Sequence, residues 1–169
     1  MEELQFAAGE GPGTDAIRSG HNVLVANVAD LRWRWPGFLE PALSRGMNAA
    51  FAFPIPADNG KPVATLTVYR LSHGTLSEGE MAVAAALQEL AGLALTEDAG
   101  ALPAETAADN TGGRWGHYHT AHIASGILSV QYQVELGDAM TLLRARALSC
   151  GRPLLDVART VCTHRAMTD

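Results

Sequence analysis

Arginines in the last third of the chain are the side chains best suited to bind an anion. A guanidinium group can pair with phosphate oxygens or stack on a nucleic-acid base. Arg144 falls off the apolar stripe of its predicted helix, so we expect it to face solvent, whereas Arg146 falls near that stripe and could cover the edge of a core. Taken singly, each arginine could also be a solvated surface charge. The arginines concerned are Arg144, Arg146, Arg152 and Arg159.

Three histidines, His117, His119 and His122, have an H-x-H-x-x-H spacing that can bind a metal ion. A metal site needs further ligands, and no cysteine or carboxylate lies near them in the sequence to complete one. We therefore expect these histidines to lie where a helix begins or to contact a nucleic acid. We expect no metal and no other cofactor.

No combination of residues predicts catalysis. The sequence has no Ser-His-Asp arrangement with a recognisable context, no setting for an activated cysteine, and no paired carboxylates in a predicted cleft. The glycine-rich residues 9–15 superficially suggest a phosphate-binding loop. However, no strand precedes them, Pro12 lacks an amide donor, and Glu10 and Asp15 would repel phosphate. We predict that the protein is not an enzyme.

The composition and charge indicate a globular chain in two parts. Hydrophobic residues make up 47% and charged residues 18% of its 169 residues, which is typical of folded proteins. Residues 1–111 carry six Lys or Arg against fourteen Asp or Glu, a net charge of −8. Residues 112–169 carry six against four, a net charge of +2. This split predicts two units, of which the second could approach a polyanion.

Nothing in the sequence predicts a secreted or membrane protein. The N-terminus has neither a basic start nor a long apolar core. The longest apolar run, residues 81–95, is interrupted by Gln88 and Glu89 and is too short to span a bilayer. Cys150 and Cys162 fall in apolar helical patterns, so we expect buried reduced thiols. These features predict a cytoplasmic protein with no membrane partner.

The acidic part has an α+β pattern. Ser77 and Glu80 have the spacing of a capping box, which predicts a helix from about Gly79 to Leu95. The aromatic residues within 32–36 could form an exposed patch, but we favour their packing a helix onto a sheet. The remaining predicted elements are strands over 22–26, 48–55 and 62–71 and a short helix over 36–45.

The basic part has the pattern of a linker followed by three helices. Residues 96–113 lack apolar periodicity, which predicts a linker. Short connections between the three helical segments that follow predict a compact bundle. Gly126 lies inside the first segment and costs about 1 kcal/mol relative to Ala, so either another helix or a bound molecule should approach its backbone closely. The predicted apolar faces are Ile123, Ile127 and Val130, with Ala124 and Leu128 beside them; Ala139, Leu142, Leu143 and Ala147; and Leu154, Leu155, Ala158, Val161 and Cys162.

The three helical segments carry motifs that resemble the ANTAR family. They are A-x-G-I-L at 124–128, A-x-x-L-L-R-x-x-A at 139–147 and L-x-x-V-A at 154–158, in the family's order. The resemblance implies a three-helix domain that binds paired RNA hairpins with short terminal loops and prevents terminator formation. It implies RNA contacts at His122, Ala124, Ser125, Gly126, Arg144, Arg146, Arg152 and Arg159.

Segments of the acidic part resemble the GAF domain. They are LQFAAGEGPGTDAI at 4–17, RWPGF at 34–38, ALSRGMNAAFAFPIP at 42–56 and the strand ending at 66–69. The resemblance implies an antiparallel sheet flanked by helices that holds a small ligand. Because the family usually has a helix and its first strands before the LQ segment, it implies a partial GAF domain. We expect either a truncated gene product or a half-domain completed by dimerisation.

Together the two resemblances imply a transcription antitermination regulator of the actinobacterial type. We expect a partial GAF-like α+β domain over residues 1–95, a linker over 96–114 and an all-α three-helix ANTAR bundle over 115–169. The expected partners are RNA stem-loop hairpins, a second copy of the chain in a homodimer, and a small molecule at the GAF-like half. The alternative is a ligand-sensing or protein-interaction module that dimerises without binding RNA.

Overall fold

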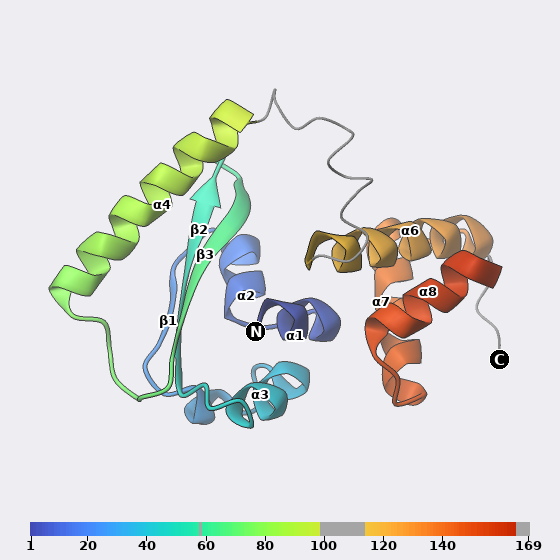
Figure 1. Cartoon of the computed structure of the whole chain (residues 1–169), viewed down its shortest axis with the longest axis horizontal. Coiled ribbons are helices and arrows are strands. Elements are labelled where there is room, and N and C mark those ends of the chain that lie inside the picture. The colour runs from blue at the N-terminus through green and yellow to red at the C-terminus, as the bar shows by residue number, and fades with distance from the viewer. Residues whose placement is uncertain (58, 99–113, 165–169) are drawn as a thin grey trace. The chain divides into compact units, whose positions relative to one another are not determined.

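The computed structural model describes residues 1–57, 59–98 and 114–164. The chain divides into two compact units, Met1–Ala101 and Leu102–Asp169 (Figure 1). Most of the predicted linker lies outside the described residues. At its two ends, residues 96–98 belong to the last helix of the first unit and Arg114 to the first helix of the second.

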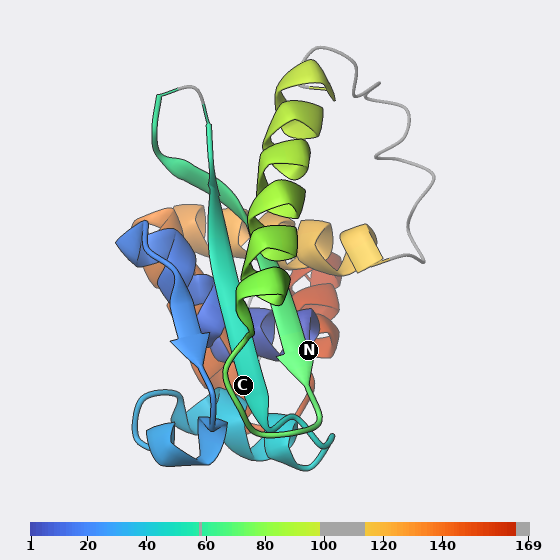
Figure 2. The same cartoon turned by 90° about the vertical axis from the view of Figure 1, so that its left-hand side faces the viewer.

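The first unit contains a three-stranded antiparallel sheet in the order β1-β2-β3 (Figure 2). All three predicted strands are confirmed, with bounds that differ by no more than a residue or two. Five α-helical or 3-10 segments accompany them. The elements are α1 Glu2–Ala8, α2 Pro12–Ser19, β1 Val23–Val25, η1 Val28–Leu31, α3 Pro36–Leu43, β2 Ala49–Pro56, β3 Pro62–Arg70 and α4 Glu78–Asp98.

The sheet separates two apolar clusters because successive strand residues point to opposite faces. On one face, Ala50 and Ala52 of β2 pack with Ala16 of α2 and with Phe38 and Leu39 of α3. On the other face, the buried cluster joins alternate residues of β2 to α4, which crosses the sheet (Figure 2). That second cluster contains Ala49, Phe51, Phe53 and Ala84, with Leu66 and Val68 of β3 half-buried against it.

Helices α1 and α2 were not predicted, although the sequence holds their end signals. Gly9 and Gly20 follow the two helices in the left-handed conformation, with φ of 73° and 71°, which glycine adopts without strain. Pro12 is the first residue of α2. A backbone N–H at this position has no hydrogen-bond partner within the helix, so proline, which lacks the N–H, costs no hydrogen bond there. These signals mark short helices, and neither α1 nor α2 has a long apolar stripe to identify it.

The capping box at the start of α4 is confirmed. The Ser77 amide donates to Glu80 Oε2 at 2.8 Å and the Glu80 amide donates to Ser77 Oγ at 3.3 Å. Two exposed backbone donors at the helix start are satisfied in this way. Glu80 also lies 3.6 Å from Arg70. The Ser77 hydrogen bonds lower the pKa of the Glu80 carboxyl.

Over residues 114–164, the second unit has three helices, as the sequence predicts: α6 Arg114–Tyr132, α7 Leu136–Ser149 and α8 Leu154–His164. Helix α6 packs against both others. It ends at Gln133, which has a φ of 55°, and the Val134 amide donates to the Ser129 carbonyl at 3.1 Å to close the last turn. Gly151, with a φ of 61°, follows the C-cap residue Cys150 of α7 in the left-handed conformation that commonly ends a helix.

The buried faces of α7 and α8 largely agree with the predicted ones, whereas the buried face of α6 lies at Ala124 and Leu128, beside the predicted stripe. Ile123 and Val130 are exposed, Val130 at 82% of its surface, and Leu142 is exposed as well. Smaller residues occupy the core in their place, because small side chains allow helix axes to approach closely. The buried side chains are Ala121, Ala124, Ser125 and Leu128 of α6; Ala139, Met140, Leu143 and Ala147 of α7; and Leu154, Val157, Ala158 and Val161 of α8.

Both cysteines are free thiols, but the prediction that both are buried is wrong for Cys150, which is exposed just after α7. Cys162 is half-buried and its thiol lies 3.7 Å from the Thr120 carbonyl; burial raises its pKa. Among the helices that the structure describes, none is long and apolar enough to cross a bilayer.

Candidate functional site

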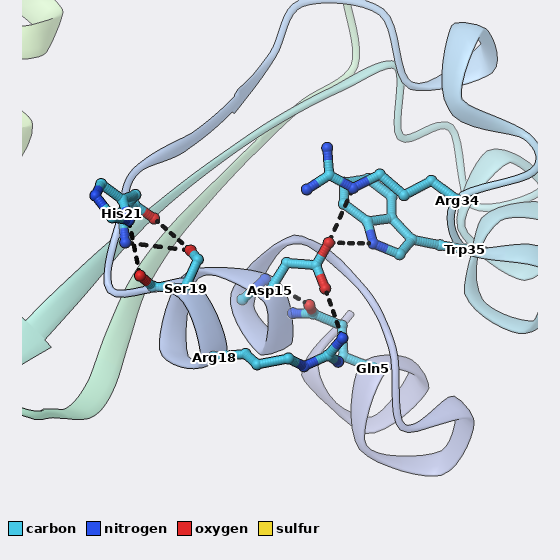
Figure 3. Close-up of polar contacts among 8 residues, drawn as sticks. Gln5, Asp15, Arg18, Ser19, His21, Arg34 and Trp35 are labelled. Atoms are coloured by element: carbon cyan, nitrogen blue, oxygen red, sulfur yellow. Dashed lines mark hydrogen bonds and ion pairs between the residues drawn. The ribbon is translucent and has the colours of Figure 1, made fainter.

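Asp15 is the centre of a polar network that joins α2 to the segment before α3 (Figure 3). Its Oδ2 accepts a hydrogen bond from Arg34 Nε at 2.9 Å and another from Trp35 Nε1 at 3.0 Å. Its Oδ1 lies 3.6 Å from the Arg18 guanidinium. Only 15% of the Asp15 side chain is exposed. The network therefore ties the N-terminal segment to a buried tryptophan twenty positions along the chain.

Trp35 sits in the core, whereas its neighbour Trp33 is exposed. The Trp35 ring meets Phe38 edge to face with ring centres 6.2 Å apart, and the Arg34 guanidinium lies 5.2 Å from the centre of the Trp35 ring. The interpretation that these aromatics pack a helix onto the sheet is thus confirmed for Trp35 and wrong for Trp33.

Glu10 makes a second link between the same two segments. Its carboxylate accepts a hydrogen bond from the Gly37 amide, in the first turn of α3. An acidic side chain is favourable there because the first amides of a helix lack internal partners. Both acidic residues of the glycine-rich segment are thus engaged by hydrogen bonds within the chain. Glu10 accepts from the first turn of α3, and Asp15 accepts from Trp35.

Gln5 of α1 is buried and connects three elements. Its Oε1 accepts from the Gly13 amide at 2.7 Å, and its Nε2 donates to the Tyr69 hydroxyl at 2.7 Å. The packing around it leaves no space for another side chain: a Cβ on Gly11, whose φ is 139°, would lie 2.5 Å from Gln5 Oε1. Gly11 and Gly13 therefore allow α2 to approach Gln5.

Tyr69 ends a row of polar side chains on β3. Thr65, Thr67 and Tyr69 alternate along the strand, so they share the face that α2 covers. The Tyr69 hydroxyl donates to Glu2. Desolvation, followed by the hydrogen bond and charge of Glu2, raises the pKa of Tyr69 above its usual value. Sequence reasoning identified neither Gln5 nor Tyr69, because no spacing rule joins residues so far apart.

The polar groups of this network are matched to one another. Among the described residues, no buried side-chain nitrogen or oxygen lacks a hydrogen-bond partner. No group of three or more His, Cys, Asp or Glu within the described part of the chain could hold a metal ion. The network around Gln5 and Asp15 thus fixes the helices against the sheet, and the half-buried threonines of β3 remain as its accessible polar edge.

In the second unit, two of the residues expected to contact RNA are buried. Ala124 and Ser125 have no exposed surface, which corrects the expectation that their side chains face a ligand. The Ser125 hydroxyl donates to the His122 carbonyl at 2.9 Å within α6. A small hydroxyl at this position therefore fits the helix interface without leaving an unsatisfied group.

The four candidate arginines differ in exposure. Arg152 and Arg159 are exposed, and Arg152 donates weakly to the Thr160 hydroxyl of α8 at 3.4 Å. Arg144 and Arg146 are half-buried on α7. The prediction that Arg144 faces solvent is therefore confirmed only in part, and burial lowers the pKa of its guanidinium.

Gly126 and His122 lie on the accessible side of α6. His122 is exposed one turn before Gly126. A Cβ on Gly126 would meet no atom within 4 Å beyond its own part of α6. No helix among residues 114–164 packs closely on this glycine. The other expected explanation, that a bound molecule approaches its backbone, stays a prediction.

Comparison with known proteins identifies the first unit. No curated protein sequence matches the chain. A solved structure described as the structure of the GAF domain is similar at 18% sequence identity and a TM-score of 0.41, over 50% of this chain and 45% of that one. Residues 1–96, more than half of the sequence, match the family model of the GAF domain. The chain therefore belongs to the GAF domain family of signal-sensing and regulatory modules.

Proposed function

We propose that this protein is a transcription antitermination regulator in which the GAF unit senses a signal and the three-helix unit binds RNA hairpins. The resemblance of α6, α7 and α8 to the ANTAR family supports this, since its motifs fall on all three helices in order. RNA bound in this way would prevent a terminator from forming. Such a regulator acts in the cytoplasm and needs no catalytic residue.

The observation that carries the proposal is the open glycine in α6. A glycine inside a helix costs about 1 kcal/mol relative to alanine, and nothing in the described part of the unit uses the space above Gly126. An RNA backbone or an unstacked base could occupy this space, beside the exposed ring of His122. Arg152 and Arg159 are exposed cations of the same unit that could contact phosphates.

The test is a gel-shift titration of the full chain with an RNA that carries two hairpins. We expect a shift at micromolar protein and an affinity that falls as salt rises, because phosphate contacts release counterions. Absence of a shift at low salt would contradict the proposal. A protein that shifts the RNA equally at low and high salt would contradict the phosphate contacts.

A glycine pair separates binding from folding. Gly126→Ala should raise helix stability by about 1 kcal/mol and weaken RNA binding at least tenfold, because the methyl group fills the space that the RNA needs. Gly137 of α7 is the matched control, since its Cβ would also meet nothing within 4 Å. Gly137→Ala should leave RNA binding unchanged. Equal binding by both variants would remove Gly126 from the interface.

Arginine variants test the cationic contacts. Arg159 is exposed. Arg159→Ala should weaken RNA binding and reduce the slope of log affinity against log salt concentration by about the amount that one phosphate contact contributes. Arg144→Ala should weaken binding while the helical circular dichroism stays unchanged. Because Arg144 is half-buried, loss of helicity in this variant would instead assign it to the fold.

The accessible polar edge of the GAF unit supports a small-molecule signal. Thr65 and Thr67 offer hydroxyl groups at a half-buried strand face, where a ligand could combine hydrogen bonds with partial desolvation. Chemical-shift changes at these residues on adding cell metabolites would identify the ligand. Changes confined to the second unit would contradict this location.

A second function is favoured by the apolar exposure of α6. Ile123 and Val130 are large apolar side chains on its surface, which suits a protein-interaction unit that does not bind RNA. Failure of the gel shift, together with loss of self-association in a Val130→Lys variant, would support this alternative.

A further inference from the structure

Helix α7 turns an exposed face away from the core of the second unit. Its buried side chains include Leu143 and Ala147, and the residues on the opposite side of the helix, spaced at intervals of three and four, are all exposed. Leu148 is 86% exposed and Leu142 is 38% exposed. The name α7 face is used below for these exposed residues, which are Asp138, Thr141, Leu142, Ala145, Leu148 and Ser149.

The α7 face is symmetric about Ala145. Leu142 and Leu148 lie three residues before and after this alanine, and Thr141 and Ser149 lie four residues before and after it. When two copies of α7 run antiparallel about a two-fold axis at Ala145, each leucine therefore comes level with a leucine and each hydroxyl with a hydroxyl. The small side chain at the axis lets the two helices approach closely. A C2 interface requires such self-complementarity, because the same patch serves as both partners.

Opposite charges stand at the two ends of the α7 face. Asp138 lies seven residues before Ala145, and Arg152 lies seven residues after it, just beyond the end of α7. Both side chains are exposed, and among the described residues neither forms an ion pair. The same two-fold axis brings each aspartate level with the arginine of the other copy. Antiparallel pairing thus places opposite charges together at both ends, whereas parallel pairing would place like charges together.

We infer that a second copy of this chain docks on the α7 face, pairing α7 with α7 antiparallel about Ala145. The leucines supply the apolar contact, and the charged ends set the direction and the register of the two helices. Because the surface is a single helix face, we expect a dissociation constant in the micromolar range. The inference goes beyond the proposed function and does not depend on RNA binding, since Gly126 and His122 of α6 are not part of the α7 face.

A cysteine crosslink tests the inference in the full chain, because it reports which surfaces meet whatever the oligomeric state of the first unit. Cys150→Ser first removes the exposed native thiol. In that background, Ala145→Cys should form an intermolecular disulfide under mild oxidation at least about tenfold faster than Gln131→Cys, since a residue on the axis of two close helices meets its own copy within disulfide range. Gln131 is the control because it is exposed on α6. Equal rates for the two variants would overturn the inference.

A charge swap separates pairing from folding. Asp138→Arg and Arg152→Asp, each added to the Ala145→Cys chain, should slow the disulfide at least about fivefold, because like charges then meet at both ends of the α7 face. The chain that carries both substitutions again places opposite charges together and should recover the original rate. A chain with both substitutions that crosslinks no faster than those with one would contradict the proposed register.

Lysine variants test the apolar contact. Leu148→Lys in the Ala145→Cys chain should slow the disulfide at least about tenfold, since pairing would bring an ammonium group against apolar side chains. Val130→Lys is the matched control, because Val130 is 82% exposed on α6, and it should crosslink at the original rate. If Val130→Lys slows the disulfide and Leu148→Lys does not, the two copies meet through α6 and the inference fails.

Discussion

Replacing Asp15 tests whether the network at the start of α2 stabilises the GAF unit. Asp15→Ala removes the acceptor for two donors, Trp35 Nε1 and Arg34 Nε. Trp35 is buried, so its indole N–H would lose its partner without gaining water. An unsatisfied buried donor costs about 1–3 kcal/mol, and a hydrogen bond to a charged acceptor lies at the upper end of this range. The ion pairs add less, because Arg18 and Arg34 are well exposed.

We therefore expect Asp15→Ala to lower the free energy of unfolding by about 2–3 kcal/mol. Urea unfolding followed by tryptophan fluorescence measures this change, and the midpoint should fall by roughly 1–2 M for a unit of this size. Asp15→Asn keeps one acceptor oxygen and should lose about half as much.

A double-mutant cycle between Asp15→Ala and Trp35→Phe isolates the indole hydrogen bond, with an expected coupling of about 1.5 kcal/mol. Arg34→Ala is the control and should cost less than about 1 kcal/mol. An Asp15→Ala variant within about 0.5 kcal/mol of the wild type, or an Arg34→Ala variant that costs as much as Asp15→Ala, would refute the assignment of the stability to Trp35.

Three further predictions concern the backbone and the buried hydroxyl. Gly11→Ala should destabilise the GAF unit by about 2 kcal/mol or more in urea unfolding, because it combines an unfavourable φ with a clash against Gln5. A change below about 0.5 kcal/mol would show instead that α1 moves to relieve the clash. Gln133→Gly should stabilise the second unit by about 0.5–1 kcal/mol in thermal unfolding, because glycine adopts the positive φ of this position without strain; a lower midpoint would contradict this explanation. Because the pKa of Tyr69 is raised in the folded protein, the unfolded state loses this proton first, and stability should fall as pH rises above about 10, the ordinary tyrosine pKa. Tyr69→Phe should remove that part of the pH dependence, and an unchanged pH profile in this variant would assign it to other groups.

The secondary structure was largely predictable because local patterns determine it. Alternating β-branched residues indicate β3, and the Ser77–Glu80 pair marks the start of α4. Each of these signals acts over a few residues, so neighbouring sequence suffices to detect it.

The packing and the polar network were less predictable because they depend on partners distant in sequence. On α6 the larger Ile123 and Val130 suggested the core face, yet Ala121 and Ala124 are buried, since the preferred face depends on the shape of α7 and α8. Likewise, the sequence indicates only that Asp15 would repel phosphate. The fold is needed to show that Trp35 donates a hydrogen bond to it.

The hydrogen bond between Gln5 and Tyr69 has a consequence for the order of folding. The two residues are 64 positions apart, so this bond can form only after β3 has been synthesised and has paired with β2. The three helices of the second unit are joined by short turns and can fold through local contacts soon after they leave the ribosome. During synthesis, the Gln5 side chain should therefore lack its Tyr69 partner until β3 pairs, and the contacts of α1 with α2 and α3 alone must hold the helix until then.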